Sequence, residues 1–347
     1  MCNSVIVHGV FKTVYDYLHT WYFFGHFIYR RMNYDLCSVL VCGGRTFTFL
    51  AIKAADYVDL IDKKTSLSGA FIGGVMLSAV TSLPEMFMSI SSTLMLKQPG
   101  LCMGNILGSD LFNLLILAVL ALVFFRTYSK ADISKSHLYV LGTILVGYAA
   151  ILLNMLGILK VEILTVSITS LIIFVCYGVS FKHLSGEEGE VSDEDDSRLT
   201  LKQVIVRFVL VSIGIIALSI VISYVTDEIS DKLNLGKGIA GALFMGIATS
   251  LPELASSVAL FKKKSFDIAA GNMIGSNIFN MAILALTDVL YIKGGVYDFS
   301  DPKTVNLIYF GIAGTVLMFA AVKFKKNWVK VCGMLGIIAC YACFLLV

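Results

Sequence analysis

The chain has 347 residues, of which 57% are hydrophobic and 15% are charged. A soluble domain usually has about a quarter of its residues charged, so this composition excludes an ordinary soluble enzyme and a disordered chain. The 27 basic and 24 acidic residues nearly cancel, which argues against nucleic-acid binding. We therefore expect a protein of the lipid bilayer, in which any charged residue inside a helix is a candidate functional group.

Apolar runs of roughly 20 residues, the length that crosses a bilayer, recur along the chain. They predict an all-α membrane protein with about ten transmembrane helices. Arg45, Lys53 and Asp56 interrupt the first helix, and we expect them to pair with one another or to lie at the membrane surface. In chain order, the predicted helices cover about residues 36–58, 68–96, 101–125, 137–155, 159–181, 203–225, 237–261, 268–291, 305–322 and 329–347.

The polar segments divide the chain into parts. Residues 1–35 are interpreted as an N-terminal extension, because this aromatic-rich stretch lacks the pattern of a signal peptide. Residues 184–202 contain seven acids and predict a solvated cytoplasmic linker between five-helix halves at 36–183 and 203–347. With the linker inside, 15 lysines and arginines lie on the cytoplasmic side and six outside, as the positive-inside rule requires.

Cysteine chemistry is not expected. The eight cysteines have no metal-binding spacing, and the C-x-x-C at Cys340 and Cys343 lies in an apolar helix, where cysteines usually serve as small packing residues. The sequence predicts no cofactor.

Two blocks of sequence occur twice. T-S-L-P-E stands at 81–85 and at 249–253, and G-N-x-x-G-S-x-x-F-N stands at 104–113 and at 271–280. Across the extended blocks, 12 of 23 aligned positions are identical, at offsets of 168 and 167 residues. Corresponding predicted helices are five apart, an odd number, so the copies should cross the membrane in opposite directions. This inverted repeat is the plan of secondary transporters, which bind substrate where the repeats meet.

The repeated helices have polar stripes that consist almost entirely of oxygen ligands. Such oxygens suit hard cations such as Ca²⁺ and Na⁺, and no histidine or cysteine joins them to indicate zinc or copper. Glycines in the same blocks would allow close helix packing. The stripes contain Ser78, Thr81, Ser82, Glu85, Ser89 and Ser92, then Asn105, Ser109 and Asn113, then Thr249, Ser250, Glu253 and Ser257, and finally Asn272, Ser276 and Asn280.

The prolines and glutamates of the repeated blocks indicate further ligands and the charge of the predicted cation site. Pro84 and Pro252 each remove a backbone hydrogen bond, which frees the carbonyl groups of Val80 and Ala248 as further ligands. The two ionised glutamates of the stripes give the pocket about two negative charges, which one Ca²⁺ or two Na⁺ would neutralise. A bare buried carboxylate costs several kcal/mol, so this arrangement favours exchange over one-way transport.

Some of these polar residues have a simpler interpretation. Ser78, Ser92 and Ser256 are expected to bond the backbone of their own helix, as serines in membrane helices often do. Asp110 adjoins a stripe, but its repeat partner is Asn277, so it is either the fringe of the site or a helix-packing group.

At these duplicated blocks the chain resembles the cation/calcium exchanger superfamily, in particular short prokaryotic-like members of the sodium/calcium exchanger type. The resemblance covers roughly residues 36–347. It implies antiport of Na⁺ against Ca²⁺ by alternating access, with the first and sixth helices sliding over a fixed core. The ion ligands it implies are Thr81, Ser82, Glu85, Ser109 and Asn113 in the first repeat and Thr249, Ser250, Glu253, Ser276 and Asn280 in the second.

One position departs from the resemblance. Related exchangers often have an aspartate where this chain has Asn280, which makes K⁺ co-transport a weaker expectation and leaves the Na⁺ stoichiometry open. The proton-coupled branch has an additional glutamate in the block that spans 104–113 here, and this chain lacks it. Cation/proton exchange therefore ranks second to Na⁺/Ca²⁺ exchange.

Two alternatives come from other classes of protein. An intramembrane enzyme using Ser109 or Asp110 would lack a base, because all five histidines lie outside the repeated blocks. A non-transporting Ca²⁺ sensor could use the acidic linker, although that segment lacks EF-hand spacing. We therefore expect an antiporter of the plasma membrane, not an enzyme, with membrane lipid, Ca²⁺ and Na⁺ as its partners.

Overall fold

The structure is a computed structural model of the chain. It describes residues 34–94, 97–163, 165–186, 199–232, 249–292 and 294–347. Residues 1–33 of the predicted N-terminal extension, most of the acidic linker and the start of the seventh predicted helix lie outside the described residues. The elements are α2 (Tyr34–Lys64), α3 (Gly69–Phe71), η1 (Ile72–Leu77), α4 (Ser78–Thr81), α5 (Leu83–Leu94), α6 (Pro99–Val123), α7 (Phe125–Tyr128), α8 (Ser136–Met155), β1 (Glu162–Ile163), β2 (Val166–Ser167), α9 (Ile168–Ser185), α10 (Leu201–Lys232), α12 (Leu251–Lys263), α13 (Phe266–Leu290), α14 (Pro302–Lys323) and α15 (Asn327–Leu346).

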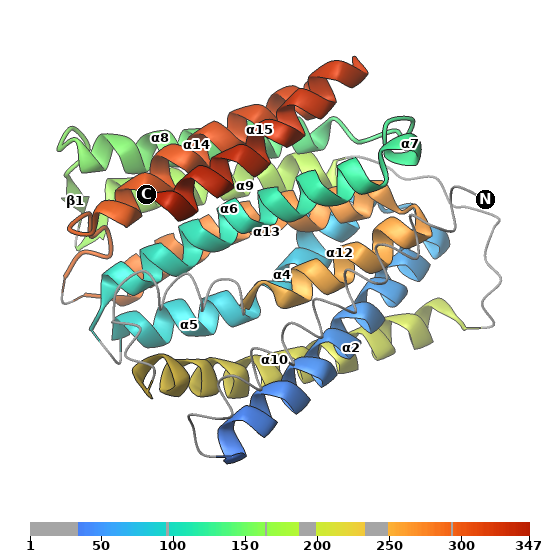
Figure 1. Cartoon of the computed structure of the whole chain (residues 1–347), viewed down its shortest axis with the longest axis horizontal. Coiled ribbons are helices and arrows are strands. Elements are labelled where there is room, and N and C mark those ends of the chain that lie inside the picture. The colour runs from blue at the N-terminus through green and yellow to red at the C-terminus, as the bar shows by residue number, and fades with distance from the viewer. Residues whose placement is uncertain (1–33, 95–96, 164, 187–198, 233–248, 293) are drawn as a thin grey trace.

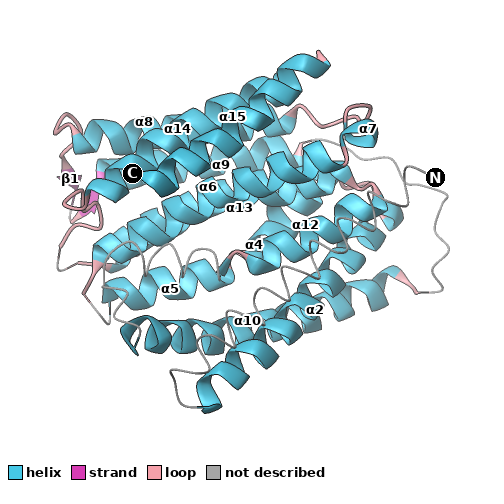
Figure 2. Ribbon diagram, in the orientation of Figure 1, coloured by secondary structure: helices cyan, strands magenta, loops and turns pink. Residues whose placement is uncertain are grey.

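The helices pack in layers around two central ones, α6 and α13, which contact each other along the bundle (Figure 1). On one side, α8, α9, α14 and α15 cover this pair, and on the other side lie α5 and α12. Beyond them, α2 and α10 pack against each other at the edge of the molecule (Figure 1). Figure 2 shows that the described residues are almost entirely helical, apart from one short hairpin at an end of the bundle.

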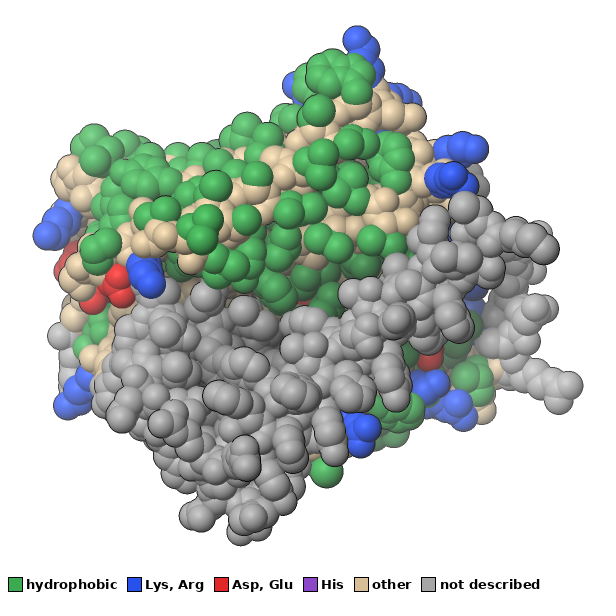
Figure 3. Space-filling model, in the orientation of Figure 1, with side chains coloured by type: hydrophobic (Ala, Val, Ile, Leu, Met, Phe, Trp, Pro, Cys, Tyr) green, Lys and Arg blue, Asp and Glu red, His purple; other side chains and the backbone are tan. Residues whose placement is uncertain are grey.

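The helices have the length and composition of membrane spans. Among the described residues, seven helices are long and apolar enough to cross a bilayer, and the bent segment from Gly69 to Leu94 makes an eighth. Apolar side chains cover the visible face of α14 and α15, with lysines and arginines gathered toward the ends of the helices (Figure 3). This band of apolar surface between charged ends is what lipid tails and headgroups require.

The second predicted helix is broken at the repeated motif. Its two parts meet at Ser82 with a bend of 44°, two residues before Pro84. Proline has no N–H to donate and clashes with the preceding turn, which explains a bend at this position. Ser250, the corresponding serine of the second motif, has nearly the same backbone angles, with φ −84° and ψ 9° against −89° and 6° at Ser82.

The predicted start of the fifth helix at about residue 159 is wrong. Gly157, with φ +79°, follows the end of α8, and β1 and β2 then form an antiparallel hairpin in which Ile163 pairs with Val166. α9 begins only at Ile168, where the Ser167 side chain accepts a hydrogen bond from the Thr169 N–H. The apolar composition of this segment did not reveal the turn.

Glycines bring the two repeated motifs into contact. A Cβ on Gly73 would lie 2.1 Å from the carbonyl oxygen of Ile268, and one on Gly275 would lie 2.4 Å from that of Gly74. Both distances are far below any real contact, so only glycine allows η1 and α13 to cross this closely. The crossing places the first motif beside the helix that carries the second G-N-x-x-G-S block.

Candidate functional site

Glu85 and Glu253 occupy corresponding positions near the starts of two helices in the middle of the protein. Glu85 lies in the first turn of α5 and Glu253 in the first turn of α12, and both side chains are fully buried. The free N–H groups at the start of a helix favour a carboxylate there. Among the described residues, neither glutamate takes part in an ion pair with a lysine, arginine or histidine.

Each glutamate is bonded by the motif of the other copy. Ser250 Oγ donates to Glu85 Oε1 at 3.0 Å, and Ser82 Oγ donates to Glu253 Oε1 at 3.2 Å. Thr249 also lies within hydrogen-bonding reach of Glu85, and Thr81 within reach of Glu253. The two motifs therefore form one site, although 168 residues separate them in sequence.

The central helices close this site with amide side chains. Asn105 on α6 donates to the Glu85 carbonyl oxygen at 3.3 Å and to Ser89 at 3.1 Å. Asn272, its counterpart on α13, donates to Ser257 at 3.1 Å and accepts a hydrogen bond from Thr81 at 3.3 Å. These contacts fix α5 and α12 against the central pair.

A second set of polar contacts joins α6 directly to α13. Asn113 donates to Asn277 Oδ1 at 3.0 Å, and Asn280 donates to Asp110 Oδ1 at 3.0 Å. The Asp110 carbonyl oxygen accepts another hydrogen bond from Asn277 at 3.0 Å. Asp110, for which the sequence left two interpretations, is thus fully buried and bonded to one of the predicted ligands.

Seven buried side-chain oxygens of the repeated blocks have no hydrogen-bond partner among the described residues. An unsatisfied oxygen in an apolar interior is costly, and one cation could satisfy several at once. Carboxylate, amide and hydroxyl oxygens are the ligands that Ca²⁺ and Na⁺ accept. The seven atoms are Glu85 Oε2, Glu253 Oε2, Asn105 Oδ1, Asp110 Oδ2, Asn113 Oδ1, Asn280 Oδ1 and Ser276 Oγ.

All ten predicted ligands are buried, and Ser109 lies within hydrogen-bonding reach of Glu85. Among the described residues, Ser78 and Ser92 bond only nearby backbone, as expected for packing groups: Ser78 donates to the Gly74 carbonyl oxygen and Ser92 to that of Ser89. Ser256 also donates to the carbonyl oxygen of Pro252, as expected, but in addition accepts a hydrogen bond from Asn272 Nδ2 of α13 at 3.1 Å. The sequence did not identify Asn277 as part of the contact, because its repeat partner is an aspartate and neither residue stands in the i, i+4 stripe.

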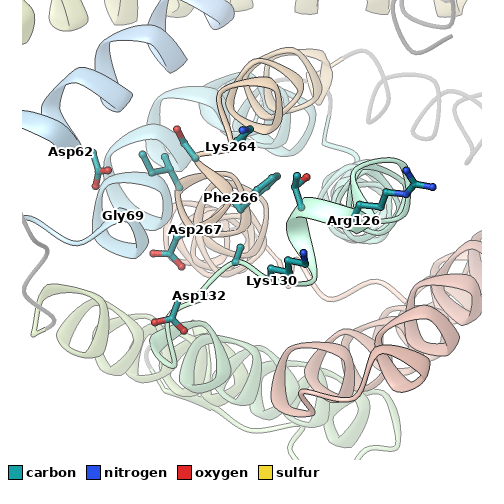
Figure 4. Close-up of a pocket in the computed structure, with 12 residues that line it drawn as sticks. Asp62, Gly69, Arg126, Lys130, Asp132, Lys264, Phe266 and Asp267 are labelled. Carbon is teal, nitrogen blue, oxygen red and sulfur yellow. The ribbon is translucent and has the colours of Figure 1, made fainter. Parts of the chain in front are cut away.

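The ends of the helices carry a separate polar cluster. Lys53 pairs with Asp56 at 3.1 Å, as expected, and Lys263 of α12 also pairs with Asp56, at 2.8 Å. An open pocket of about 640 Å³ lies near this cluster, with Asp62 on one side and Lys130 on the other (Figure 4). None of the ten predicted ligands lines it. Its mixture of acids and bases at the helix ends is that of a hydrated surface.

Asp267, which lines this pocket, contacts residues from two other parts of the chain. Asp267, in the first turn of α13, accepts a hydrogen bond from the Ser134 N–H at 2.8 Å and lies 2.9 Å from the buried ring of His137. A Cβ on Gly69 would lie 3.0 Å from the same carboxylate. The start of α13 is thereby fixed to α8 and to the segment that leads into the first motif.

The fold is that of an α-helical membrane protein, and its centre holds a buried cluster of carboxylate, amide and hydroxyl side chains. The family described as sodium/calcium exchanger protein matches residues 37–181 and 203–347, once in each half of the chain. The two matches cover most of the sequence, and the chain belongs to this family of ion exchangers. The family is one of transporters, not of enzymes.

The chain is also similar in sequence or in fold to individual membrane proteins and exchangers. The inner membrane protein YrbG of Escherichia coli is 24% identical over 84% of this chain and 89% of its own length. The human sodium/potassium/calcium exchanger 5 is 28% identical over 39% of this chain and 27% of its own length. A solved structure of the sodium-calcium exchanger NCX_Mj shares the fold, with a TM-score of 0.66 and 19% identity over 90% of this chain and 99% of that one.

Proposed function

We propose that this chain is an antiporter that exchanges Na⁺ for Ca²⁺ by alternating access. The observation that carries the proposal is the reciprocal pair of contacts, in which each motif's serine bonds the other motif's glutamate and leaves one oxygen of each carboxylate without a partner. The proposed ligands are Thr81, Ser82, Glu85, Ser109, Asn113, Thr249, Ser250, Glu253, Ser276 and Asn280.

The charge of this site explains why the two ions would exclude each other. Glu85 and Glu253 together supply two negative charges in a region where, among the described residues, no ion pair neutralises them. One Ca²⁺ or two Na⁺ would balance that charge. Leaving the carboxylates bare would cost several kcal/mol, so the site should cross the membrane only when loaded.

The architecture supports movement of substrate to both sides. We propose two inverted five-helix halves, residues 36–183 and 203–347, joined by a cytoplasmic linker at 184–202. The matching backbone angles at Ser82 and Ser250 and the reciprocal contacts support this internal symmetry. The edge pair α2 and α10, which packs outside the central helices, is the proposed moving part. The cell membrane is the proposed location.

The decisive experiment is uptake of ⁴⁵Ca²⁺ into proteoliposomes driven by an outward Na⁺ gradient. We expect Glu85→Gln and Glu253→Gln to abolish uptake, because each removes a charge from the site while preserving its shape. Glu162→Gln is the matched control, since Glu162 is an exposed residue of the β1 hairpin. Uptake by either site variant at the wild-type rate would overturn the ligand assignment.

The coupling ion is tested separately. Na⁺, K⁺ and H⁺ gradients are imposed one at a time on the wild-type protein, with the membrane potential clamped. We expect only the Na⁺ gradient to drive Ca²⁺ uptake. Uptake driven by the pH gradient alone would instead assign the chain to cation/proton exchange, with the same carboxylates binding the proton.

A further inference from the structure

Two pairs of residues that correspond between the repeats lie in the contact between α6 and α13, and one of these pairs differs in charge. Asp110 corresponds to Asn277, and Asn113 corresponds to Asn280, at the same offset of 167 residues. Three of these residues are amides and one is a carboxylate. In the structure the four bond across the two helices, Asn113 with Asn277 and Asn280 with Asp110. The carboxylate therefore breaks the charge symmetry of an otherwise matched contact.

Among the described residues, Asp110 has no ion-pair partner that balances its charge. Its side chain is fully buried, its Oδ1 accepts from Asn280 Nδ2 at 3.0 Å, and its Oδ2 has no hydrogen-bond partner in the part of the chain that the structure describes. A buried carboxylate with one free oxygen and no counter-charge needs a cation or a proton.

The same contact also determines how the amides face the site. Asn280 gives its Nδ2 to Asp110, and Asn113 gives its Nδ2 to Asn277, which leaves the Oδ1 atoms of both without a partner. Both free amide oxygens belong to proposed ligands. The hydrogen bond between Asn280 and Asp110 thus joins two side chains that each keep one oxygen without a partner among the described residues, Asn280 Oδ1 and Asp110 Oδ2.

We propose that Asp110 is a third acidic group of the ion site and binds a monovalent cation together with Asn280. The inference rests on the proposed function and deepens it. With Glu85 and Glu253 alone, two Na⁺ neutralise the site, whereas a third carboxylate requires one further monovalent cation. Asp110 then sets the number of Na⁺ ions exchanged for each Ca²⁺.

The test compares wild-type protein, Asp110→Asn and the exchanged variant Asp110→Asn/Asn280→Asp in proteoliposomes. At fixed ion gradients, the dependence of net Ca²⁺ flux on membrane potential gives the charge moved per Ca²⁺, since an electroneutral exchange of two Na⁺ for one Ca²⁺ does not respond to the potential. We expect Asp110→Asn to lower that charge by about one and the exchanged variant to restore it, because the carboxylate returns to the same contact from α13. Glu162→Gln should match the wild type.

Binding of ²²Na⁺ to the purified proteins in detergent gives a second measurement, with a melting curve to show that each variant is folded. We expect Asp110→Asn to bind about one Na⁺ fewer than the wild type. An unchanged dependence of Ca²⁺ flux on membrane potential and unchanged ²²Na⁺ binding in Asp110→Asn would overturn the inference while leaving Na⁺/Ca²⁺ exchange intact. A wild-type protein that shows no Na⁺-driven Ca²⁺ uptake would overturn both.

Discussion

Ser82 and Glu253 meet across the centre of the protein, with the serine Oγ 3.2 Å from the glutamate Oε1. The counterpart contact, from Ser250 Oγ to Glu85 Oε1, is 3.0 Å long. Each half of the chain thereby completes the site of the other half, so neither copy of the motif could form the site alone.

The first prediction concerns these two serines. Ser82→Ala and Ser250→Ala should each raise the Ca²⁺ concentration needed for half-maximal uptake by roughly 10- to 100-fold, because a hydrogen bond to a buried charge contributes about 1.5–3 kcal/mol. The two effects should be similar, since the contacts correspond. Ca²⁺ dependence of Na⁺-driven uptake measures both.

Ser92→Ala is the control for this pair, because Ser92 is also a buried serine of α5 but bonds only the carbonyl oxygen of Ser89. It should leave the Ca²⁺ dependence close to that of the wild type. An equal loss in Ser92→Ala would mean that general helix packing, and not the reciprocal contact, sets the affinity.

The second prediction concerns the crossing of η1 and α13. Gly275→Ala would place a Cβ 2.4 Å from the carbonyl oxygen of Gly74, so the two backbones would have to separate. We expect a loss of stability of about 1–3 kcal/mol or more, measured as a lower melting temperature, together with loss of uptake. Gly178→Ala is the control, since nothing among the described residues lies within 4 Å of a Cβ there. Equal melting temperatures would contradict the close crossing.

The third prediction concerns Asp288, a buried carboxylate near the end of α13. Its Oδ2 accepts hydrogen bonds from the Ser167 N–H at 2.8 Å and from Ser170 Oγ at 2.7 Å. Asp288→Asn removes the charge that strengthens both bonds, and we expect the melting temperature to fall by roughly 2–6 °C.

Asp298→Asn is the matched control for Asp288. Asp298 Oδ1 also accepts a backbone hydrogen bond, from the Ser300 N–H at 3.0 Å, but in an exposed loop. Its replacement should change the melting temperature little, because water can satisfy the same groups. The same fall in both variants would show that the β2–α9 junction does not depend on Asp288.

The fourth prediction concerns the attachment of α2 to α12. Lys263 pairs with Asp56 at 2.8 Å and with Asp59 at 3.5 Å, so it joins the proposed moving helix to the helix that carries Glu253. Lys263→Gln should make hydrogen exchange of residues 51–64 a few-fold faster, which corresponds to an ion pair of about 0.5–1 kcal/mol. The effect should diminish in high salt.

Lys264→Gln removes a neighbouring exposed charge and serves as the control for Lys263. If both variants exchange at the wild-type rate, the ion pairs do not restrain α2. If both exchange faster to the same degree, net charge at this surface, rather than the specific pair, is responsible.

Patterns in the sequence predicted most of the helices and the polar residues of the candidate site. Apolar length predicted the helices, and the duplicated T-S-L-P-E and G-N-x-x-G-S blocks located the polar stripes. These predictions were possible because burial in lipid leaves only helices as stable spans and makes every polar residue inside one conspicuous. The hairpin before α9 was missed because its residues are as apolar as a span.

By itself, the sequence determined that the chain lies in a membrane, that its halves are related and that Glu85 and Glu253 are exceptional. Only the tertiary structure decided that each motif's serine bonds the other motif's glutamate, and that Asp110 belongs beside Asn280. Those contacts join residues more than 160 positions apart. Periodicity along one helix shows which side chains share a face, but the partner across that face depends on how closely the helices pack, which here requires glycine at the crossing of η1 and α13.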